Sequence, residues 1–262
     1  KEHFTMAAAK LADKDEEYKR LECLLKERGI DEARAEMRRK LQNWKETVIK
    51  FGVTGSSGAG KSSFINFIRD KKDDDPGAAE VDVVEKTDEP KFFPFKGKIT
   101  FVDLPGIGSK NYPDVETYSE KVKLETYDTF LILTSTRFTH LELELAQKIK
   151  SSGKSFFLVR TKIDIDEMND KRKRNHDIDR MLEKIRDYVF EVVKDIKEIK
   201  RSDIFLISNV NGKYPGKKKR FDFELLLCAI LDALPREQKE ALTRSVKLLS
   251  VDFVEKKVKI LK

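Results

Sequence analysis

The sequence predicts an α/β fold built on a mostly parallel sheet, and two observations lead to this prediction. Continuous apolar runs typical of buried strands alternate with helical patterns, at Ile99–Val102, Thr129–Leu133, Ser155–Val159 and Ile204–Ile207. Strands that are apolar throughout are typical of parallel sheets covered by helices on both faces. In addition, residues 55–62 read GSSGAGKS between an apolar, β-branched run and an apolar helical pattern. This strand–loop–helix order is typical of phosphate-binding loops, so we expect ligands at the carboxyl ends of the strands.

Two helices are expected before the first strand. From Leu11 to about Trp44, apolar residues recur at three- and four-residue steps between charged residues. Gly29 is expected to end the first of these helices and Asp31 to cap the second. The first strand is then expected over residues 47–53, directly before the glycine-rich loop.

The rest of the chain divides into helical patterns, a connection and a tail. Asp73–Gly77 is predicted to break the structure, and the stretch up to about Gly97 is interpreted as an exposed connection rather than a core element. Beyond Pro235, an amphipathic tail is expected to pack on the N-terminal helices. Helices are expected over 114–125, 139–151, 171–200 and 221–234. The predicted domains are an N-terminal helical segment over 1–45, an α/β domain that contains the glycine-rich loop over 46–235 and the start of a C-terminal helical segment over 236–262.

Composition excludes several classes of protein. The chain has 262 residues, 39% of them hydrophobic and 39% charged, which is typical of a globular protein with well-solvated helices. The net charge of +7 is concentrated in two short runs, 171–174 and 217–220, which we interpret as solvated loops rather than as a patch for nucleic acid or anionic membrane. The two cysteines and three histidines lack the spacing of a disulfide framework or a metal site, so a reducing compartment fits best. The longest apolar run, Leu225–Leu231, is far too short to span a membrane.

The glycine-rich loop carries the first chemical prediction. Gly55, Gly58 and Gly60 allow a tight turn whose backbone N–H groups approach phosphate without a Cβ in the way. Lys61 is expected to reach the β- and γ-phosphates, and the Ser62 hydroxyl to ligate Mg²⁺. A flexible Gly/Ser linker is the alternative, but linkers are rarely flanked on both sides by core-forming segments.

A second motif follows the 98–102 strand. Asp103 is expected to hold Mg²⁺ through water, and the backbone N–H of Gly106 to meet the γ-phosphate. Glycine at 106 also lets the loop move when that phosphate is lost. Standing alone, Asp103–Gly106 would be interpreted as an ordinary turn at the end of a strand.

A third motif predicts which base the bound nucleotide carries. Thr161-Lys162-Ile163-Asp164 matches the guanine-recognition motif of GTPases, with Thr in place of the usual Asn. The Asp164 carboxylate can accept two hydrogen bonds from N1 and N2 of guanine, which adenine cannot supply, while the Lys162 stem packs over the base. Ser208 and Asn209 follow the next strand and are expected to add contacts to the base.

The three motifs occur in the order expected for GTP binding, with GTP/GDP and Mg²⁺ as the predicted ligands. A P-loop ATPase is the competing class, and Asp164 argues against it. The predicted nucleotide-binding residues are Gly55, Ser56, Ser57, Gly58, Ala59, Gly60, Lys61, Ser62, Ser63, Thr161, Lys162, Asp164, Ser208 and Asn209.

Beyond these signatures, the chain resembles the immunity-related, interferon-inducible GTPases over nearly its whole length. The resemblance is carried by the strings 54–66, 77–80 leading to 83–87, 103–109, 136–138 and 159–164. Lys61 resembles the GKS subgroup of this family. Val81 and Asp82 depart from the Thr-Gly often found in the family, and members usually carry a longer C-terminal helical domain.

The resemblance implies a Ras-like G domain with a helical domain built from both chain ends. It also implies GTP-dependent dimers or oligomers formed through the nucleotide face, in the cytoplasm and on membranes that enclose intracellular pathogens. No nucleic-acid partner is expected.

The residue after Gly106 predicts the rate of hydrolysis. Ras-type enzymes have a glutamine there that orients the attacking water, and the aliphatic Ile107 cannot do so. We therefore expect slow hydrolysis by the monomer and acceleration when two nucleotide faces meet, with Glu85 and Thr87 as candidates for the missing polar groups. A scaffold protein that holds GTP and hardly hydrolyses it is the alternative.

Overall fold

The structure, a computed structural model, describes residues 19, 22–23, 25–32, 34–35, 48–81, 88–95, 98–196, 199–210, 221–235, 238–239 and 242–243. The chain falls into two units, Lys1–Glu46 and Thr47–Lys262. In the first unit, residues 25–28 and 30–32 are helical, and Gly29 between them has a φ of 85°. The predicted break at Gly29 is therefore confirmed. Asp31 does not cap the second stretch as predicted, because Ile30 before it is already helical.

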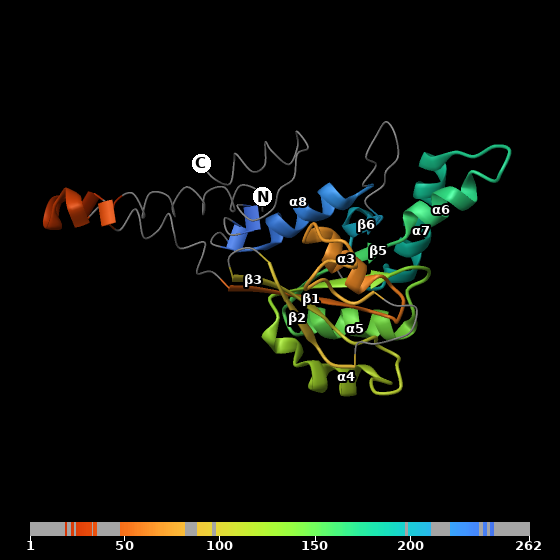
Figure 1. Ribbon diagram of the computed structural model, residues 1–262, viewed down its shortest axis with the longest axis horizontal. Helices are drawn as coiled ribbons and strands as arrows, with labels where there is room; N and C mark the ends of the chain where they lie inside the picture. The colour runs from red at the N-terminus through yellow and green to blue at the C-terminus, as the bar shows by residue number, and fades with distance from the viewer. Residues whose placement is uncertain are drawn as a thin grey trace. The chain divides into compact units, whose positions relative to one another are not determined.

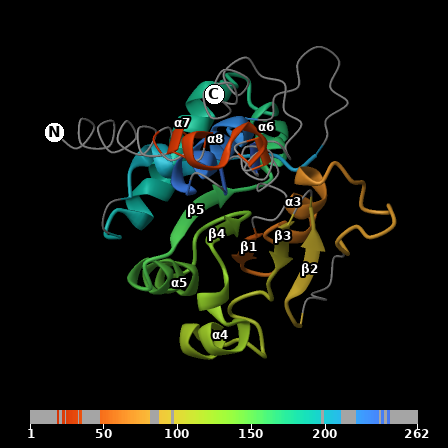
Figure 2. The ribbon, with the colours of Figure 1, turned by 90° about the vertical axis from the view of Figure 1, so that its left-hand side faces the viewer.

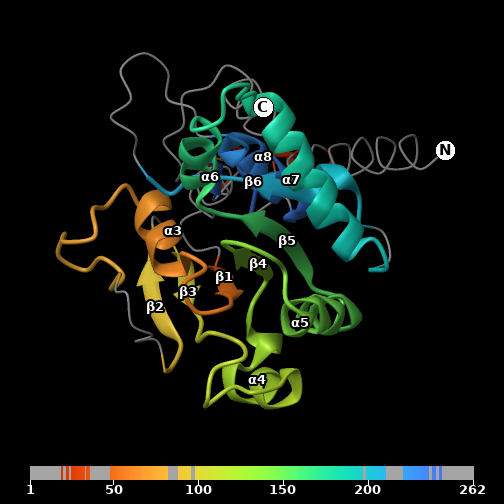
Figure 3. The ribbon, with the colours of Figure 1, turned by 90° about the vertical axis from the view of Figure 1, so that its right-hand side faces the viewer.

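The second unit contains a six-stranded sheet (Figure 3), in the order β2-β3-β1-β4-β5-β6. Neighbouring strands are parallel from β3 to β6, and β2 runs antiparallel to β3. The strands are β1 (Val48–Gly55), β2 (Lys91–Pro94), β3 (Lys98–Asp103), β4 (Thr129–Thr134), β5 (Ser155–Arg160) and β6 (Ile204–Leu206). A mostly parallel sheet is thus confirmed, and the five parallel strands lie where the apolar runs predicted them.

The register places the ends of the parallel strands together. Val53 pairs with Asp103 on one side and Leu131 on the other, and Gly55 pairs with Leu133. Arg160 likewise pairs with Leu206. The loops that follow β1, β3, β5 and β6 therefore leave the sheet along the same edge, where ligands of open α/β sheets bind.

Helices cover both faces of the sheet (Figures 1 and 2), with α4 and α5 on one face and α3 and α8 on the other. On the first face, residues of α4, α5 and α7 pack with β3 to β6 in one buried apolar cluster. On the second face, Phe223 of α8 packs edge-to-face on Phe64 and Phe67 of α3, with ring centroids 6.3 and 4.6 Å apart. The helices are α3 (Lys61–Ile68), α4 (Val115–Val122), α5 (His140–Ser151), α6 (Ile163–Asp170), α7 (Ile178–Val193) and α8 (Phe223–Ala233), with 3₁₀ turns η1 (Leu124–Thr126) and η2 (Arg201–Asp203).

Two further sequence predictions are wrong. The stretch up to Gly97 is not only a connection, because it contains the edge strand β2, in which Phe93 pairs with Phe101. The 171–200 pattern is not one helix, because α7 begins only at Ile178, where the Asp177 side chain accepts a hydrogen bond from the Arg180 backbone N–H. An N-cap of this kind starts a new helix rather than continuing an old one.

Most of the predicted C-terminal tail, together with Glu85 and Thr87, lies outside the described residues. Among the described residues, no helix is long and apolar enough to cross a membrane.

Candidate functional site

The loop between β1 and α3 requires glycine at its first position. Gly55 has a φ of 136°, and a Cβ there would lie 1.9 Å from the carbonyl oxygen of Leu133. Gly60 has a φ of 85° and forms the N-cap of α3 without a side-chain hydrogen bond. Because Gly60 offers no capping side chain, the N-terminus of α3 is open to an anion.

Lys61 lies within the loop rather than in solvent. The residue is 8% exposed, and its Nζ donates to the carbonyl oxygens of Gly55 (3.2 Å) and Ser56 (3.1 Å). The loop backbone thus holds the ammonium group beside the N-terminus of α3. This arrangement places a cation where the phosphate-binding prediction expects one.

The predicted magnesium residues lie in contact with each other. The Ser62 hydroxyl donates to Asp103 Oδ2 over 2.6 Å. Asp103 is 1% exposed, and its Oδ1 is buried with no hydrogen-bond partner among the described residues. Burial raises the pKa of Asp103, while the Ser62 hydrogen bond and the Lys61 charge oppose that shift. A hydroxyl beside a carboxylate that has one oxygen left unbonded among the described residues fits Mg²⁺, which prefers oxygen ligands.

The loop after β3 is anchored beside β1. The Tyr118 hydroxyl of α4 donates to the carbonyl oxygen of Pro105 (3.2 Å) and lies 2.5 Å from the Thr54 hydroxyl. Tyr118 is fully buried, which raises the pKa of its hydroxyl. Gly106 is buried as well, and Ile107, 4% exposed, belongs to the apolar cluster. The position that carries glutamine in Ras-type enzymes is therefore occupied here by a core side chain.

Thr161 joins the predicted base-binding loop to the phosphate loop. Its hydroxyl lies 2.7 Å from the carbonyl oxygen of Ala59 and 3.1 Å from that of Thr134. Thr161 is fully buried, and its backbone N–H also donates to Thr134. The side chain that departs from the usual Asn thus bonds to the backbone of the neighbouring loops.

Asp164 and the residues after β6 lie together. Lys162 has a φ of 60° and forms the N-cap of α6, which places Asp164 in the first turn of that helix. The Ser208 hydroxyl donates to Asp164 Oδ1 over 2.7 Å. Asn209 Nδ2 donates to the carbonyl oxygen of Gly60 (3.0 Å), while its Oδ1 is buried and finds no hydrogen-bond partner in the part of the chain that the structure describes. The two strand ends at β5 and β6 therefore converge on the phosphate loop.

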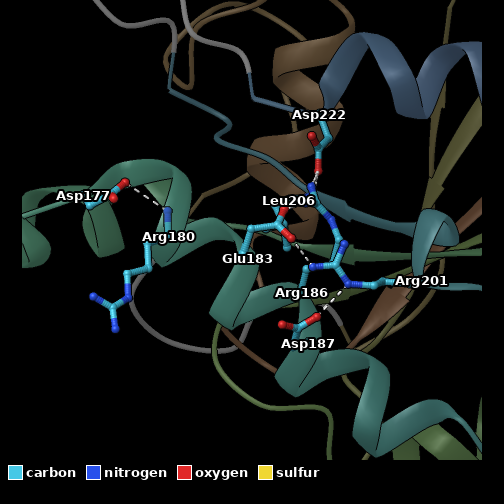
Figure 4. Close-up of polar contacts among 8 residues, drawn as sticks. All are labelled: Asp177, Arg180, Glu183, Arg186, Asp187, Arg201, Leu206 and Asp222. Atoms are coloured by element: carbon cyan, nitrogen blue, oxygen red, sulfur yellow. Dashed lines mark hydrogen bonds and ion pairs between the residues drawn. The ribbon is translucent and has the colours of Figure 1, made fainter.

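A polar network on α7 and α8 fixes β6 from outside the site (Figure 4). Arg186 of α7 donates to Asp222 Oδ2 over 2.6 Å, and the same oxygen accepts the Leu206 backbone N–H over 2.9 Å. Arg201 forms ion pairs with Glu183 and Asp187 beside it. Leu206 ends β6, so this network holds the strand that leads to Ser208 and Asn209.

Of the other predicted residues, Ser57 and Gly58 are exposed and Ser63 is half-buried. Sequence reasoning missed Glu142, whose fully buried carboxylate contacts Ser56 in the phosphate loop. The available signal was local: Thr139 and Glu142 form a capping box at the start of α5. Nothing in that pattern indicated a contact with a residue far away in the sequence.

The fold and these loops define the class of the protein as α/β P-loop GTPase-like. A mostly parallel sheet carries a glycine-rich loop after β1, an acidic loop after β3 and the Thr161–Asp164 motif after β5. Hydrogen bonds join these loops at one edge of the sheet.

The chain belongs to the interferon-inducible GTPase family, whose description "Interferon-inducible GTPase (IIGP)" matches residues 14–262. Interferon-inducible GTPase 1 of Mus musculus is 36% identical over 222 residues, covering 82% of this chain and 51% of the relative. Interferon-inducible GTPase 5 of Rattus norvegicus is 33% identical over 246 residues, covering 92% of this chain and 51% of the relative. The chain thus spans about half the length of these relatives. The family predicted from sequence strings is confirmed.

Among solved structures, Era in complex with MgGDPNP and nucleotides 1506–1542 of 16S ribosomal RNA is 23% identical, with a TM-score of 0.48, and the likeness covers 72% of this chain and 57% of Era. At this level of likeness, family membership rests on the sequence matches alone.

Proposed function

We propose that this chain binds GTP with Mg²⁺ and hydrolyses it to GDP and phosphate. The observation that carries the proposal is the convergence of three loops on the phosphate loop, in which Ser62 contacts Asp103, Ala59 contacts Thr161 and Gly60 contacts Asn209. One ligand that reaches from Asp164 to Lys61 would lie along this meeting of the four loops. A guanine nucleotide has a base for one end and phosphates for the other.

Each residue has a distinct task in this proposal. The loop backbone and Lys61 hold the β- and γ-phosphates, and the Gly106 N–H meets the γ-phosphate. Ser62 and Asp103 hold Mg²⁺, which neutralises charge on the phosphate oxygens when bound. Water attacks the γ-phosphorus, the bond to the β–γ bridging oxygen breaks, and GDP leaves with that electron pair.

Base selection is assigned to Asp164. The Ser208 hydroxyl donates to one oxygen of this carboxylate, and Lys162 forms the N-cap of α6 in a left-handed conformation. A carboxylate acceptor favours the N1 and N2 donors of guanine over adenine. Buried Arg160 supports this turn, because its Nη2 donates to Asp166 over 2.8 Å.

We further propose slow hydrolysis by a single copy and faster hydrolysis when two nucleotide faces meet. The support is Ile107, which is buried in the apolar cluster and has no polar atom for a water. Glu85 and Thr87 stay candidates for the groups supplied at that contact. A GTP-holding scaffold with hardly any turnover is the second candidate function, favoured by the same burial of Ile107.

Family membership supports the broader proposals. These are self-association through the nucleotide face, a role in cell-autonomous defence in the cytoplasm and at an intracellular membrane surface, and a helical domain built from segments 1–45 and 236–262 around a GTPase domain over 46–235. Lys61 supports placement in the GKS subgroup. No nucleic-acid partner is proposed.

Turnover measured across a protein dilution series tests these proposals. The phosphate release rate per molecule should fall as the protein is diluted, and Lys61→Ala should lower binding or turnover whatever the base. A high rate that is independent of concentration would contradict activation by self-association. GTP binding without any single-turnover phosphate release would favour the scaffold.

A further inference from the structure

Glu142 of α5 is a buried carboxylate in contact with the phosphate loop. The residue is 0% exposed. Its Oε1 accepts hydrogen bonds from the Ser56 backbone N–H (2.9 Å) and the Ser56 hydroxyl (2.7 Å), and its Oε2 accepts the Thr139 backbone N–H (2.7 Å). All three partners are donors, which is the arrangement that suits an ionised carboxylate.

The carboxylate is itself held in place from α5. Thr139 is the N-cap of this helix, and its side chain accepts the Glu142 backbone N–H in a reciprocal capping box. α5 also packs in the apolar cluster through Leu145, Ala146 and Ile149. Glu142 therefore presents a fixed acceptor to the loop.

Ser56 is the residue of the loop through which this acceptor can act. Its carbonyl oxygen receives Lys61 Nζ over 3.1 Å and the Ala59 backbone N–H over 3.2 Å. The preceding Gly55 is fixed against Leu133 by its close backbone approach. A shift of Ser56 would therefore move both the first turn of the loop and the lysine ammonium.

We infer that Glu142 is a positioning residue for phosphate binding, which acts through Ser56 on the loop and on Lys61. The inference rests on the proposed function, because it presumes that phosphates of a guanine nucleotide bind this loop. Glu142 does not itself touch the phosphates in this role. Its carboxylate keeps the loop in the binding conformation before the nucleotide arrives, which lowers the cost of binding.

The substitution Glu142→Gln tests this inference with little change in shape. A glutamine amide has one oxygen and one NH₂ group, so it cannot accept from Ser56 and Thr139 at the same time without placing two donors face to face. Asp114→Asn is the matched control, because the Asp114 side chain accepts the Thr117 backbone N–H (2.8 Å) and hydroxyl (3.0 Å) at the N-terminus of α4. Both substitutions neutralise a helix-capping carboxylate, but only Glu142 contacts the phosphate loop.

The measurement is the affinity of the full chain, with Mg²⁺, for GTP, GDP and GMP in competition with a fluorescent GDP analogue. Glu142→Gln should lower the affinities for GTP and GDP by about tenfold each, which is the effect of about one lost charge-assisted hydrogen bond. The affinity for GMP should change by less than about twofold. GMP is the internal control, since it lacks the β-phosphate that the loop surrounds. Asp114→Asn should leave all three affinities within about twofold.

Ser56→Ala provides a second variant in case Glu142→Gln does not fold. It removes the hydrogen bond from the Ser56 hydroxyl to Glu142 and keeps the one from the backbone N–H. The affinities for GTP and GDP should therefore fall about threefold, with the affinity for GMP unchanged. In the double variant Glu142→Gln/Ser56→Ala, the second substitution should lower the GTP affinity by less than Ser56→Ala does alone, because both changes act on one contact.

Three results would each be decisive. Unchanged GTP and GDP affinity in both variants overturns the inference while leaving the proposed function standing. Equal loss for GMP also overturns it, because the effect would then not lie at the phosphates. Failure of the unaltered chain to bind any guanine nucleotide rejects the proposed function itself.

Discussion

The two ends of the candidate site are built from different materials. At the phosphate end, the backbone shapes most of the loop, through glycines at positive φ and carbonyl oxygens around Lys61, and the Ser62–Asp103 bond is a side-chain contact beside it. At the base end, side chains hold the loops, through Thr161 to Ala59 and Ser208 to Asp164. Binding of phosphates should therefore depend on loop conformation, and choice of base on single side chains.

The largest effect is expected from a substitution that clashes with the backbone at the phosphate end. Gly55→Ala places a Cβ 1.9 Å from the Leu133 carbonyl oxygen, so strand β4 or the loop must move. We expect the free energy of unfolding to fall by about 3 kcal/mol or more in urea denaturation. Gly58→Ala is the matched control, because its φ is 72° but its Cβ would meet no atom within 4 Å. A loss of about 1 kcal/mol is expected there, and equal losses would contradict the role given to Leu133.

The second effect removes the cation of the phosphate end. Lys61→Ala should lower single-turnover GTP hydrolysis by about 10²-fold, because the ammonium offsets charge that develops on the transferred phosphate. Its effect should be the same for GTP and for ITP, which differ only in the base. A loss confined to one of the two nucleotides would place Lys61 at the wrong end of the site.

The third effect belongs to the base end. Asp164→Asn should weaken GTP binding by about 10²-fold, by removing an ionised acceptor of two hydrogen bonds. ITP lacks the N2 amine and should lose less, so the GTP-to-ITP preference should shrink. If the preference stays unchanged in competition binding, Asp164 does not read the base.

The smallest effect lies in the support of the base end. Arg186→Gln leaves the half-buried Asp222 without its guanidinium partner and should lower the free energy of unfolding by about 1–2 kcal/mol. Arg201→Gln, whose ion pairs are more exposed, should cost less than about 0.5 kcal/mol. Urea unfolding of the two variants sharpens the comparison, and a larger loss for Arg201→Gln would contradict it.

Periodicity and motifs predicted the five parallel strands because each is a continuous apolar run between turn signals. The edge strand β2 was missed, since it spans only Lys91–Pro94 and contains a proline. The break before Ile178 was missed because the charged residues before it fit the same helical pattern, and the Asp177 N-cap is evident only in the structure.

The candidate site was predicted from the order of the motifs along the chain, and the structure brings the loops that carry these motifs together. Thr161 was expected among the nucleotide-binding residues, and the structure adds a contact between its hydroxyl and the backbone of Ala59. Glu142 could not be predicted, because its contact with Ser56 joins residues 86 positions apart. Short-range patterns predict caps and loops, while contacts across the sheet edge depend on the register of β1 and β4.

The most direct test of the central claim is equilibrium binding of GDP and ADP to the full chain with Mg²⁺. A guanine nucleotide held between Lys61 and Asp164 predicts saturable GDP binding and ADP binding at least about 10²-fold weaker. Equal affinity for the two nucleotides, or no binding of either, would contradict the claim.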